Sequence, residues 1–423
     1  MTTTLLVAPD QPGAYQTIGD ALQDVEPGGV VTVAPGTYYE ALFTNDRPVV
    51  LVAAEGPGTV VIDARAGAFA AVSCSRTRLE LRDLTIMAAG EPAVAVTEGA
   101  NLTLTGCTLS TKTGTAIRVT DRSEFAISRC AVTGGHSGLS VAESRGTVDD
   151  SRFSDLTHDG VIFRLGSSGT VSRSAMTRCG GAGIYVADRA LPVFEDCTVS
   201  HTGLSGVVVR AGGMPTLNRL RVTDTPRAAV TFEADTAGVV DELTSADTAE
   251  PAVEVGPGSQ VAQGSVRRPP QIVAAALLMI PAAVTWVVAG IAWMVVTSRL
   301  EGDALFLFWI IALAILALCL FVAFMCVAGI RYAWRGGPKV LTIPAGFTMG
   351  LFVIAIITLI VQRKLEYKPT MLTPLIVGGL AAVALGMLNS KPADRWFAVG
   401  TIRRGLELHR KRAAAQPVAK PTG

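Results

Sequence analysis

Residues 102–132, LTLTGCTLSTKTGTAIRVTDRSEFAISRCAV, contain one complete unit of a repeat and the start of the next. Hydrophobic residues recur every 23 positions, with one gap of 21, at Leu81, Leu104, Ile127, Val148, Val171, Phe194, Leu217 and Val240. A second column keeps step with the first at Val94, Ile117, Leu139, Val161, Ile184, Val207, Val230 and Val253. Two columns in step over eight units indicate an architecture in which each unit stacks on the next.

Each unit of the repeat reads as three short strands separated by bends. In the quoted unit, Leu102 and Leu104 alternate with polar residues, as do Cys107 and Leu109, and then Ile117 and Val119. This alternation is typical of strands that place one face in a core. Small residues precede the third strand at Ala116, Gly138, Gly160, Gly183, Gly206 and Ala229. We therefore predict an all-β parallel β-helix over residues 31–258, with about ten coils at roughly 4.8 Å each.

Stacking turns each position of the repeat into a column along the rod. The inward position after one bend reads Leu84, Cys107, Cys130, Ser151, Ser174, Cys197, Leu220 and Leu243. We interpret it as a core ladder; the alternative is a redox pair, because adjacent coils bring Cys107 and Cys130 within disulfide range. A hydroxyl column, interpreted as hydrogen bonding at turns, reads Ser110, Thr133, Ser154, Thr177, Ser200 and Thr223.

The bend itself carries charges whose sign alternates from coil to coil. The column reads Arg129, Asp150, Arg173, Asp196, Arg219 and Glu242. Each charge is expected to have opposite neighbours above and below it. Exposed pairs of this kind contribute only ~0.2–1 kcal/mol each, but a network also fixes register, so we interpret the column as structural.

The third strand has an outward column that contains three apolar residues in a row. It reads Arg118, Ser140, Ile162, Tyr185, Val208 and Thr231, with Arg164 and Arg210 beside it. A contiguous apolar patch on an outward face predicts a partner-binding surface formed by Ile162, Tyr185, Val208, Arg164 and Arg210. The alternative is that a loop or tail of the same chain covers these residues.

Residues 1–30 are expected to form an N-terminal strand and a capping helix. Tyr15, Ile18, Leu22 and Val25 share one helical face, and an amphipathic helix is a common cover for the open end of a solenoid. The run YQTIGDALQDVEPGGVVTVAPGTYYEA, residues 15–41, resembles the opening of pectin-lyase-like right-handed parallel β-helices, notably pectin methylesterases. It is still more similar to actinobacterial β-helix proteins that carry an AAA+ ATPase. The resemblance covers residues 5–260 and implies the fold more strongly than an activity.

An enzyme of this fold class would act on polysaccharides, as a lyase or hydrolase. The resemblance to methylesterases implies paired Gln residues, two Asp and an Arg, but this chain has no Gln between Gln23 and Gln260. Lyases would need clustered carboxylates for Ca²⁺, and Asp150 is already assigned to the charged column. The enzyme interpretation therefore stays open but is disfavoured.

Histidines provide the best remaining candidate for chemistry. His136 and His158 each lie two residues before a bend glycine, so we expect them to stack on adjacent coils. Asp155, Asp159, Cys179 and His201 fall in the same loop region. Two His with carboxylates can bind a metal or act in catalysis, with His136, His158 and Asp159 as the candidates. Solvent-facing turn residues are the favoured interpretation, and we predict no catalytic residue, metal or cofactor.

The charge is divided unevenly between the two parts of the chain. Residues 1–268 hold 21 Lys and Arg against 30 Asp and Glu, a net charge of −9, whereas residues 269–423 hold 15 against 5, a net charge of +10. The chain also has 49% hydrophobic residues and a mean hydropathy of +0.43. This asymmetry points to a membrane surface. The sequence shows no signal peptide, and its seven cysteines form no CxxC pair, as in a reducing compartment.

After a linker at 259–268, the residues 269–390 are predicted to form an α-helical transmembrane domain. Four uncharged apolar segments, each long enough to cross a bilayer, are expected to span at about 271–298, 304–330, 340–362 and 370–390. Basic residues favour one side, at Arg267-Arg268, at 331–339 and after 400. The positive-inside rule then places both termini and the β-helix in the cytoplasm of a multi-pass plasma-membrane protein.

The ends and faces of the spans suggest further contacts. Residues 391–423 read as a basic amphipathic cytosolic tail whose membrane-surface residues are Trp396, Arg403, Arg404 and Arg410. The alternative is a solvated basic tail. Gly346 and Gly350 form a GxxxG pattern that predicts close helix packing, with a homo-oligomer as one outcome. No ionisable residue lies within the four spans, which disfavours transport.

These observations favour a non-enzymatic, membrane-anchored scaffold that presents a protein-interaction surface at the cytoplasmic face of the plasma membrane. The expected partners are the lipid bilayer and one or more proteins, with no nucleic acid. The resemblance to ATPase-linked proteins implies a setting in actinobacterial secretion or sporulation machinery. The alternative is a carbohydrate-active enzyme or carbohydrate-binding protein of the pectin-lyase-like class.

Overall fold

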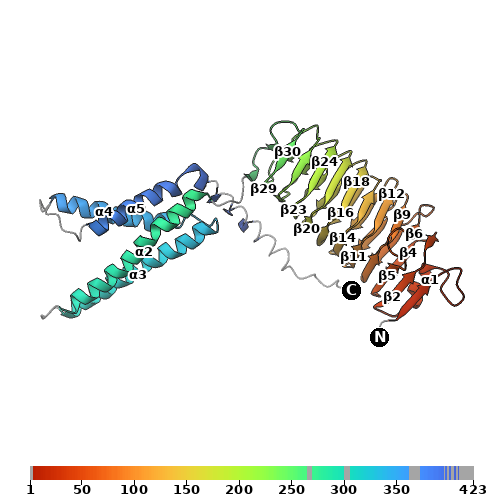
Figure 1. Cartoon of the computed structure of the whole chain (residues 1–423), viewed down its shortest axis with the longest axis horizontal. Coiled ribbons are helices and arrows are strands. Elements are labelled where there is room, and N and C mark those ends of the chain that lie inside the picture. Colours follow the sequence, from red (N-terminus) through yellow and green to blue (C-terminus); the bar gives the residue numbers. More distant parts are fainter. Residues whose placement is uncertain are drawn as a thin grey trace. The chain divides into compact units, whose positions relative to one another are not determined.

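The computed structural model describes residues 3–263, 269–299, 305–361 and 372–394, together with several residues between 396 and 408. The chain divides into two compact units, a β-helical unit over Met1–Gln263 and a helical unit over Gly264–Gly405 (Figure 1). Each unit is described by itself.

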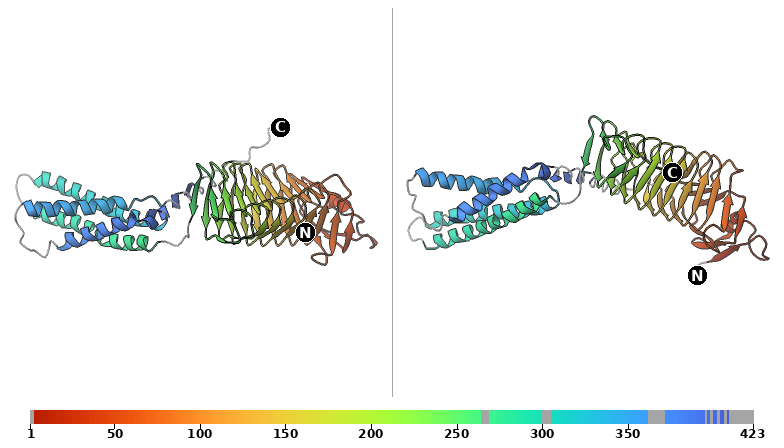
Figure 2. Two further views of the ribbon diagram at one scale, coloured as in Figure 1. Left: turned by 90° about the horizontal axis from the view of Figure 1, so that it is seen from above. Right: turned by 45° about the horizontal axis from the view of Figure 1, so that its top comes forward.

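The β-helical unit consists of three parallel sheets, A, B and C, and successive coils stack along the unit (Figure 2). A typical coil contributes one strand to each sheet. Sheet A has 12 strands: β1 (Thr4–Val7), β2 (Gly29–Val33), β5 (Val49–Ala53), β8 (Arg78–Arg82), β11 (Asn101–Thr105), β14 (Glu124–Ser128), β17 (Arg145–Asp149), β20 (Ser168–Ser172), β23 (Leu191–Glu195), β26 (Thr216–Asn218), β29 (Ala237–Asp241) and β32 (Gln260–Gln263).

Sheets B and C have ten strands each. Sheet B contains β3 (Gly36–Tyr38), β6 (Val60–Asp63), β9 (Thr85–Ala88), β12 (Thr108–Thr111), β15 (Ala131–Thr133), β18 (Arg152–Leu156), β21 (Ala175–Cys179), β24 (Thr198–Thr202), β27 (Arg221–Thr223) and β30 (Thr244–Ala246). Sheet C contains β4 (Leu42–Asn45), β7 (Val72–Ser75), β10 (Val94–Thr97), β13 (Thr115–Val119), β16 (Ser137–Ala142), β19 (Val161–Arg164), β22 (Ile184–Val186), β25 (Val207–Val209), β28 (Val230–Phe232) and β31 (Val253–Val255).

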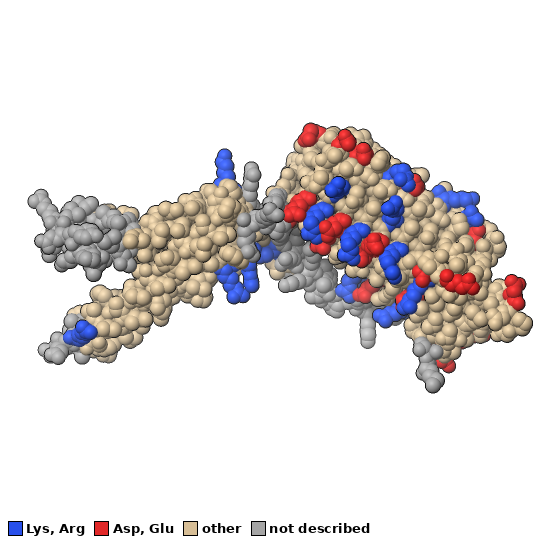
Figure 3. All heavy atoms as spheres, in the orientation of Figure 1, with Lys and Arg blue, Asp and Glu red and all other residues tan. Residues whose placement is uncertain are grey.

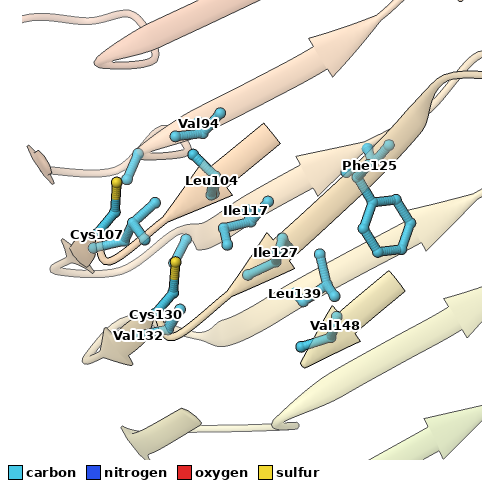
Figure 4. Packing of buried hydrophobic residues seen from close by; sticks show 14 of the residues in the cluster. Val94, Leu104, Cys107, Ile117, Phe125, Ile127, Cys130, Val132, Leu139 and Val148 are labelled. Carbon is cyan, nitrogen blue, oxygen red and sulfur yellow. The ribbon is translucent and has the colours of Figure 1, made fainter. Parts of the chain in front are cut away.

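The predicted columns are confirmed as the core of this unit. Leu81, Leu104 and Ile127 are register partners on adjacent strands of sheet A, and the pairing continues to Val240. The second column pairs in the same way through sheet C. Figure 4 shows side chains from both columns pointing into one interior. The gap of 21 residues leaves strand register intact, because Ile127 still pairs with Val148 and the connections between strands absorb the missing residues.

The Cys and Ser column satisfies buried backbone groups at the bend. Ser151 Oγ donates to Asp149 O over 2.8 Å and accepts from Cys130 N over 3.1 Å, while Ser174 Oγ accepts from Ser151 N over 3.1 Å. Buried polar backbone groups cost free energy when they are unpaired. The core-ladder interpretation is therefore confirmed. All seven cysteines are buried and free, and burial raises the pKa of Cys197 to about 11, which keeps that thiol protonated at neutral pH.

The N-terminal end of the core is covered by α1 (Ile18–Asp24), whose Ile18 and Ala21 are buried. Thr17 caps the helix by accepting from Asp20 N. Glu40, which precedes β4, accepts from Ile18 N over 2.9 Å and from Gly19 N over 2.8 Å. The negative charge of this carboxylate also interacts favourably with the positive end of the helix dipole.

The β-helix ends later than the boundary predicted at residue 258. Strand β32 pairs with β29 inside the segment 259–268 that was expected to be a linker. Val261 packs against the core and Ala262 is buried, so the alternating pattern of sheet A continues for one more strand.

The helical unit contains α2 (Pro270–Thr297), α3 (Leu305–Trp334), α4 (Thr342–Val361) and α5 (Leu372–Leu388). Within the described residues, two helices have the length and composition needed to cross a membrane, Pro270–Thr297 with mean hydropathy 2.4 and Phe306–Trp334 with mean hydropathy 3.2. Many of their large apolar side chains are exposed, and Trp286 Nε1 donates to Thr348 Oγ1 over 3.0 Å between α2 and α4. Figure 3 shows an uncharged stretch between basic side chains at the ends of this unit.

Candidate interaction surface

The predicted apolar patch lies on the outward face of sheet C. Ile162 is the register partner of Tyr185, and Tyr185 is the register partner of Val208. Ile162 and Tyr185 are half-buried, whereas Val208 is only 8% exposed. The patch is therefore narrower than the sequence suggested, with Tyr185 and Ile162 as its accessible part.

The two arginines predicted beside the patch differ in their surroundings. Arg210 forms an ion pair with Glu233 of the next coil, and hydrogen bonding to that carboxylate, with a smaller effect of nearby Tyr185, raises the pKa of Arg210. Arg164 is exposed and makes no ion pair within the described part of the chain. Arg210 is therefore held by Glu233 beside Tyr185, whereas Arg164 has no ion partner among the described residues.

The predicted stacking of the histidines is confirmed. The rings of His136 and His158 are nearly parallel, with centroids 4.7 Å apart and planes inclined by 11°. Both side chains are exposed, and His158 Nε2 lies 3.7 Å from Oδ2 of the buried Asp159. His201 is separate, near Asp224 at 3.8 Å.

The acidic groups near these histidines already have partners. Asp159 Oδ1 accepts from Ala182 N over 2.8 Å, and Asp155 forms a two-bond ion pair with Arg178. Among the described residues there is no group of three or more His, Cys, Asp or Glu placed to hold a metal ion. The pair thus offers a stacking surface with one nearby carboxylate.

A groove on sheet A was not found from the sequence. It has a volume of about 470 Å³ and crosses strands β11 to β23. Its floor consists of the short outward residues Ala126, Thr147 and Thr170, and Arg145 pairs with Glu124 at its side. The sequence signal that could have revealed this groove is the run of small residues at one repeat position. An analysis of hydrophobic periodicity does not detect it.

A second feature missed by sequence reasoning is an exposed aromatic group near the first coils. The rings of Phe43 and Phe69 meet edge to face at 6.0 Å, and Tyr39 is 80% exposed. A pocket of about 330 Å³ beside Phe43 is lined by Leu22, Val25 and neighbouring residues.

Two of the residues predicted at the membrane surface form hydrogen bonds at the end of α3. Trp396 Nε1 donates to Ala333 O over 2.9 Å, and Arg404 Nη2 donates to Gly336 O over 2.9 Å. Both side chains thereby satisfy backbone carbonyls at and just after the end of α3, and the membrane-surface position stays a prediction. Arg403 and Arg410 lie outside the described residues.

Comparison with known proteins supports the fold. Residues 73–241 match the family model described as "Right handed beta helix region". With the three parallel sheets, this match confirms the pectin-lyase-like right-handed parallel β-helix that the resemblance implied. No curated protein matches the chain.

Several solved structures are similar to the chain at low identity. Pectin methylesterase from Erwinia chrysanthemi is 12% identical with a TM-score of 0.35, over 60% of this chain and 93% of that one. Pectin methylesterase from carrot is 14% identical with a TM-score of 0.32, over 61% and 87%. The A-module of an Azotobacter vinelandii mannuronan C-5 epimerase is 12% identical with a TM-score of 0.32, over 56% and 92%.

Proposed function

We propose that the chain is a membrane-anchored β-helical scaffold whose rod presents a protein-interaction surface. The observation that carries this proposal is the presence, in one chain, of a β-helix and of helices apolar enough to span a bilayer. A rod of stacked coils offers long columns of side chains at fixed spacing, and an anchor concentrates that surface at a membrane.

The anchor is proposed to have four spans. Helix α4 has 20 uncharged residues, which meets the length needed for a bilayer crossing, and α5 begins two residues before Pro374, where a proline is tolerated in a first turn. Basic residues at 267–268, 331–339 and in the C-terminal region support, for four spans, an orientation with both termini and the β-helix in the cytoplasm. A setting in secretion or sporulation machinery belongs to the same proposal.

The interaction surface is proposed at Ile162, Tyr185 and Val208, with Arg164 and Arg210 at its edge. Tyr side chains combine apolar area with a hydroxyl group, and arginines supply directional donors, which is the composition of binding hot spots. Binding fits the site better than catalysis, because the carboxylates nearest to the histidine pair are held by backbone or arginine donors.

A photoreactive amino acid at Ile162 tests this surface in membranes of the native cell. We expect a discrete adduct with a protein partner, and its loss when Tyr185→Asp is added. The matched control places the photoreactive residue at Thr147, on the outward face of sheet A. Equal capture from both positions, or capture that Tyr185→Asp leaves unchanged, would argue against a partner at this surface.

A second candidate is a carbohydrate-binding or carbohydrate-active protein, favoured by the groove on sheet A. Hydroxyl groups of Thr147, Ser168 and Thr170 lie beside the apolar Leu191 and Val193, and sugars present both polar and apolar faces. Binding of an oligosaccharide to the purified full chain, abolished by Thr170→Trp, would support this function. An extracytoplasmic N-terminus, measured with a reporter fused at residue 1, would favour it over the scaffold.

A further inference from the structure

Two arginines at the C-terminal end of α3 make no ion pair with a described residue. Arg331 lies in the last turn of α3, and Arg335 directly follows Trp334, the last residue of the helix. Both arginines are exposed. Neither side chain makes an ion pair with a described residue, and the nearby Asp394 is already paired with Lys339. Two unpaired guanidinium groups at the end of a long apolar helix require an anionic counterpart or water.

Aromatic side chains occupy the same turn. Trp334 is 39% exposed and Tyr332 is 46% exposed. Trp334 lies three residues after Arg331, a spacing that places the two on neighbouring positions of the helix surface. Trp and Tyr favour the headgroup level of a bilayer, because each has an apolar body and a polar tip. The sequence R-Y-A-W-R at 331–335 therefore has the composition of a membrane interface.

The carbonyl groups at the end of α3, which would otherwise repel an anion, accept hydrogen bonds. Exposed carbonyls at a helix C-terminus carry partial negative charge. Here Ala333 O accepts from Trp396, Gly336 O accepts from Arg404, and Tyr332 O accepts from Gly337 N over 2.6 Å. These bonds also fix the turn, so the guanidinium groups extend from a rigid base.

We infer that Arg331 and Arg335 form a binding site for the headgroup phosphate of an anionic phospholipid, with Trp334 beside it. Guanidinium groups bind phosphate through paired, charge-assisted hydrogen bonds, and an indole ring at this depth packs against the glycerol and upper acyl region. The inference rests on the proposed membrane anchor and adds a ligand class and a location to it.

The test compares lipids bound to the full chain in a neutral detergent. Native mass spectrometry after incubation with equal amounts of phosphatidylglycerol and phosphatidylcholine should show preferential retention of phosphatidylglycerol. The double variant Arg331→Gln/Arg335→Gln should weaken that binding roughly 30-fold, since each basic residue near an anionic surface contributes about a factor of 5. Arg331→Lys/Arg335→Lys should retain part of the preference, because charge remains without the paired donors.

The control is Arg299→Gln, which removes an exposed arginine after the C-terminal end of α2. An equal loss of phosphatidylglycerol in this control would overturn the site, as would unchanged retention in the double variant. Inorganic phosphate offered alone should not raise the melting temperature. Stabilisation by phosphate equal to that by phosphatidylglycerol would overturn the lipid assignment in favour of free phosphate. The membrane anchor is tested in a separate experiment, in which membranes are extracted with alkaline carbonate. Release of the chain would contradict the anchor without testing the lipid site.

Discussion

At the scale of single residues, all members of the charged bend column share a backbone conformation that the alternation of charge sign does not reveal. Every member of the predicted column has a left-handed backbone, with φ between 44° and 54° from Arg129 to Glu242. This conformation is uncommon outside glycine, and in the preceding coil Gly106 occupies the same position with φ of 66°. Long polar side chains then leave the bend toward solvent, where they reach the adjacent coil.

The ion pairs within this column are more selective than the sequence predicted. Arg219 binds Asp196 of the preceding coil through two hydrogen bonds of 2.6 and 2.7 Å, as the alternation predicts. Arg173 instead pairs with Asp149, the last residue of strand β17, and Asp150 makes no ion pair within the described residues. A side chain of this length reaches either of two consecutive carboxylates, so column spacing alone does not identify its partner.

Replacement of Asp196 by Asn should lower the melting temperature at neutral pH and low salt. The hydrogen bonds from Arg219 hold the pKa of Asp196 below its ordinary value of 3.8 in the folded chain. Its contribution is therefore present above about pH 4 and is lost as pH falls through the lowered folded-state pKa. Thermal melts monitored by circular dichroism from pH 7 to pH 2 should show the difference between the two proteins shrinking to zero.

The matched control for this measurement is Asp150→Asn, which removes a carboxylate without an ion partner from the same column. It should leave the melting temperature nearly unchanged, and salt should weaken the effect of Asp196→Asn but not that of the control. An equal effect of both substitutions at every pH would show that net charge, rather than the pair with Arg219, is responsible.

At the scale of secondary structure, α1 depends on a residue that lies outside it. Glu40 accepts from the first two backbone N–H groups of the helix, which would otherwise lack partners. Glu40→Ala should increase amide hydrogen exchange at Ile18 and Gly19 and in β1, with little change in the central strands β11 to β23. Loss of a cap of this kind costs about 0.5–2 kcal/mol.

Hydrogen exchange with mass spectrometry checks this prediction, with Glu55→Ala as a control for loss of an exposed acidic residue elsewhere in the first coils. Unchanged protection of α1 in Glu40→Ala would show that burial of Ile18 and Ala21 holds the helix without its cap. The contrast separates an effect of the cap from that of packing alone.

The strands and their facing residues were predictable because each coil repeats the same burial pattern, so errors at one position are corrected by the next. Leu104 and Ile117 illustrate this, since both are fully buried register partners of residues in the predicted columns. Features built from unlike residues were not predictable in this way. The cap by Glu40 joins residues 22 positions apart outside the repeat, and the groove depends on the small size of Thr147 and its neighbours.

The candidate surface was predictable in position but not in extent. The repeat places Ile162, Tyr185 and Val208 on adjacent strands, and the structure has them in register. How far each side chain protrudes depends on its neighbours within the sheet, and Val208 is nearly buried. The hydrogen bonds of Trp396 and Arg404 could not be predicted either, because the carbonyls that they contact lie at and just after the end of α3, 63 and 68 residues earlier in the sequence.

At the scale of the whole molecule, the number of spans determines which segments face the two sides of the membrane. With four spans, residues 299 and 364 lie outside and residue 335 lies inside, whereas with only α2 and α3 spanning, residue 364 also lies inside. The seven native cysteines are buried, which leaves a low background for thiol labelling. We therefore predict that Arg299→Cys and Lys364→Cys react with an impermeant maleimide in intact cells, and that Arg335→Cys reacts only after permeabilisation.

Each outcome of this labelling has a distinct physical meaning. Reaction at residue 299 alone would indicate two spans, with α4 and α5 associated with the inner face of the bilayer. Reaction of Arg335→Cys in intact cells would indicate the inverted topology, with the β-helix outside the cytoplasm. The carbohydrate-related function would then be the better proposal. The basic residues at 331–339 oppose that inversion, because arginines and lysines flanking a span are retained on the cytoplasmic side. The topology thus decides which of the two proposed functions the exposed columns of the β-helix can serve.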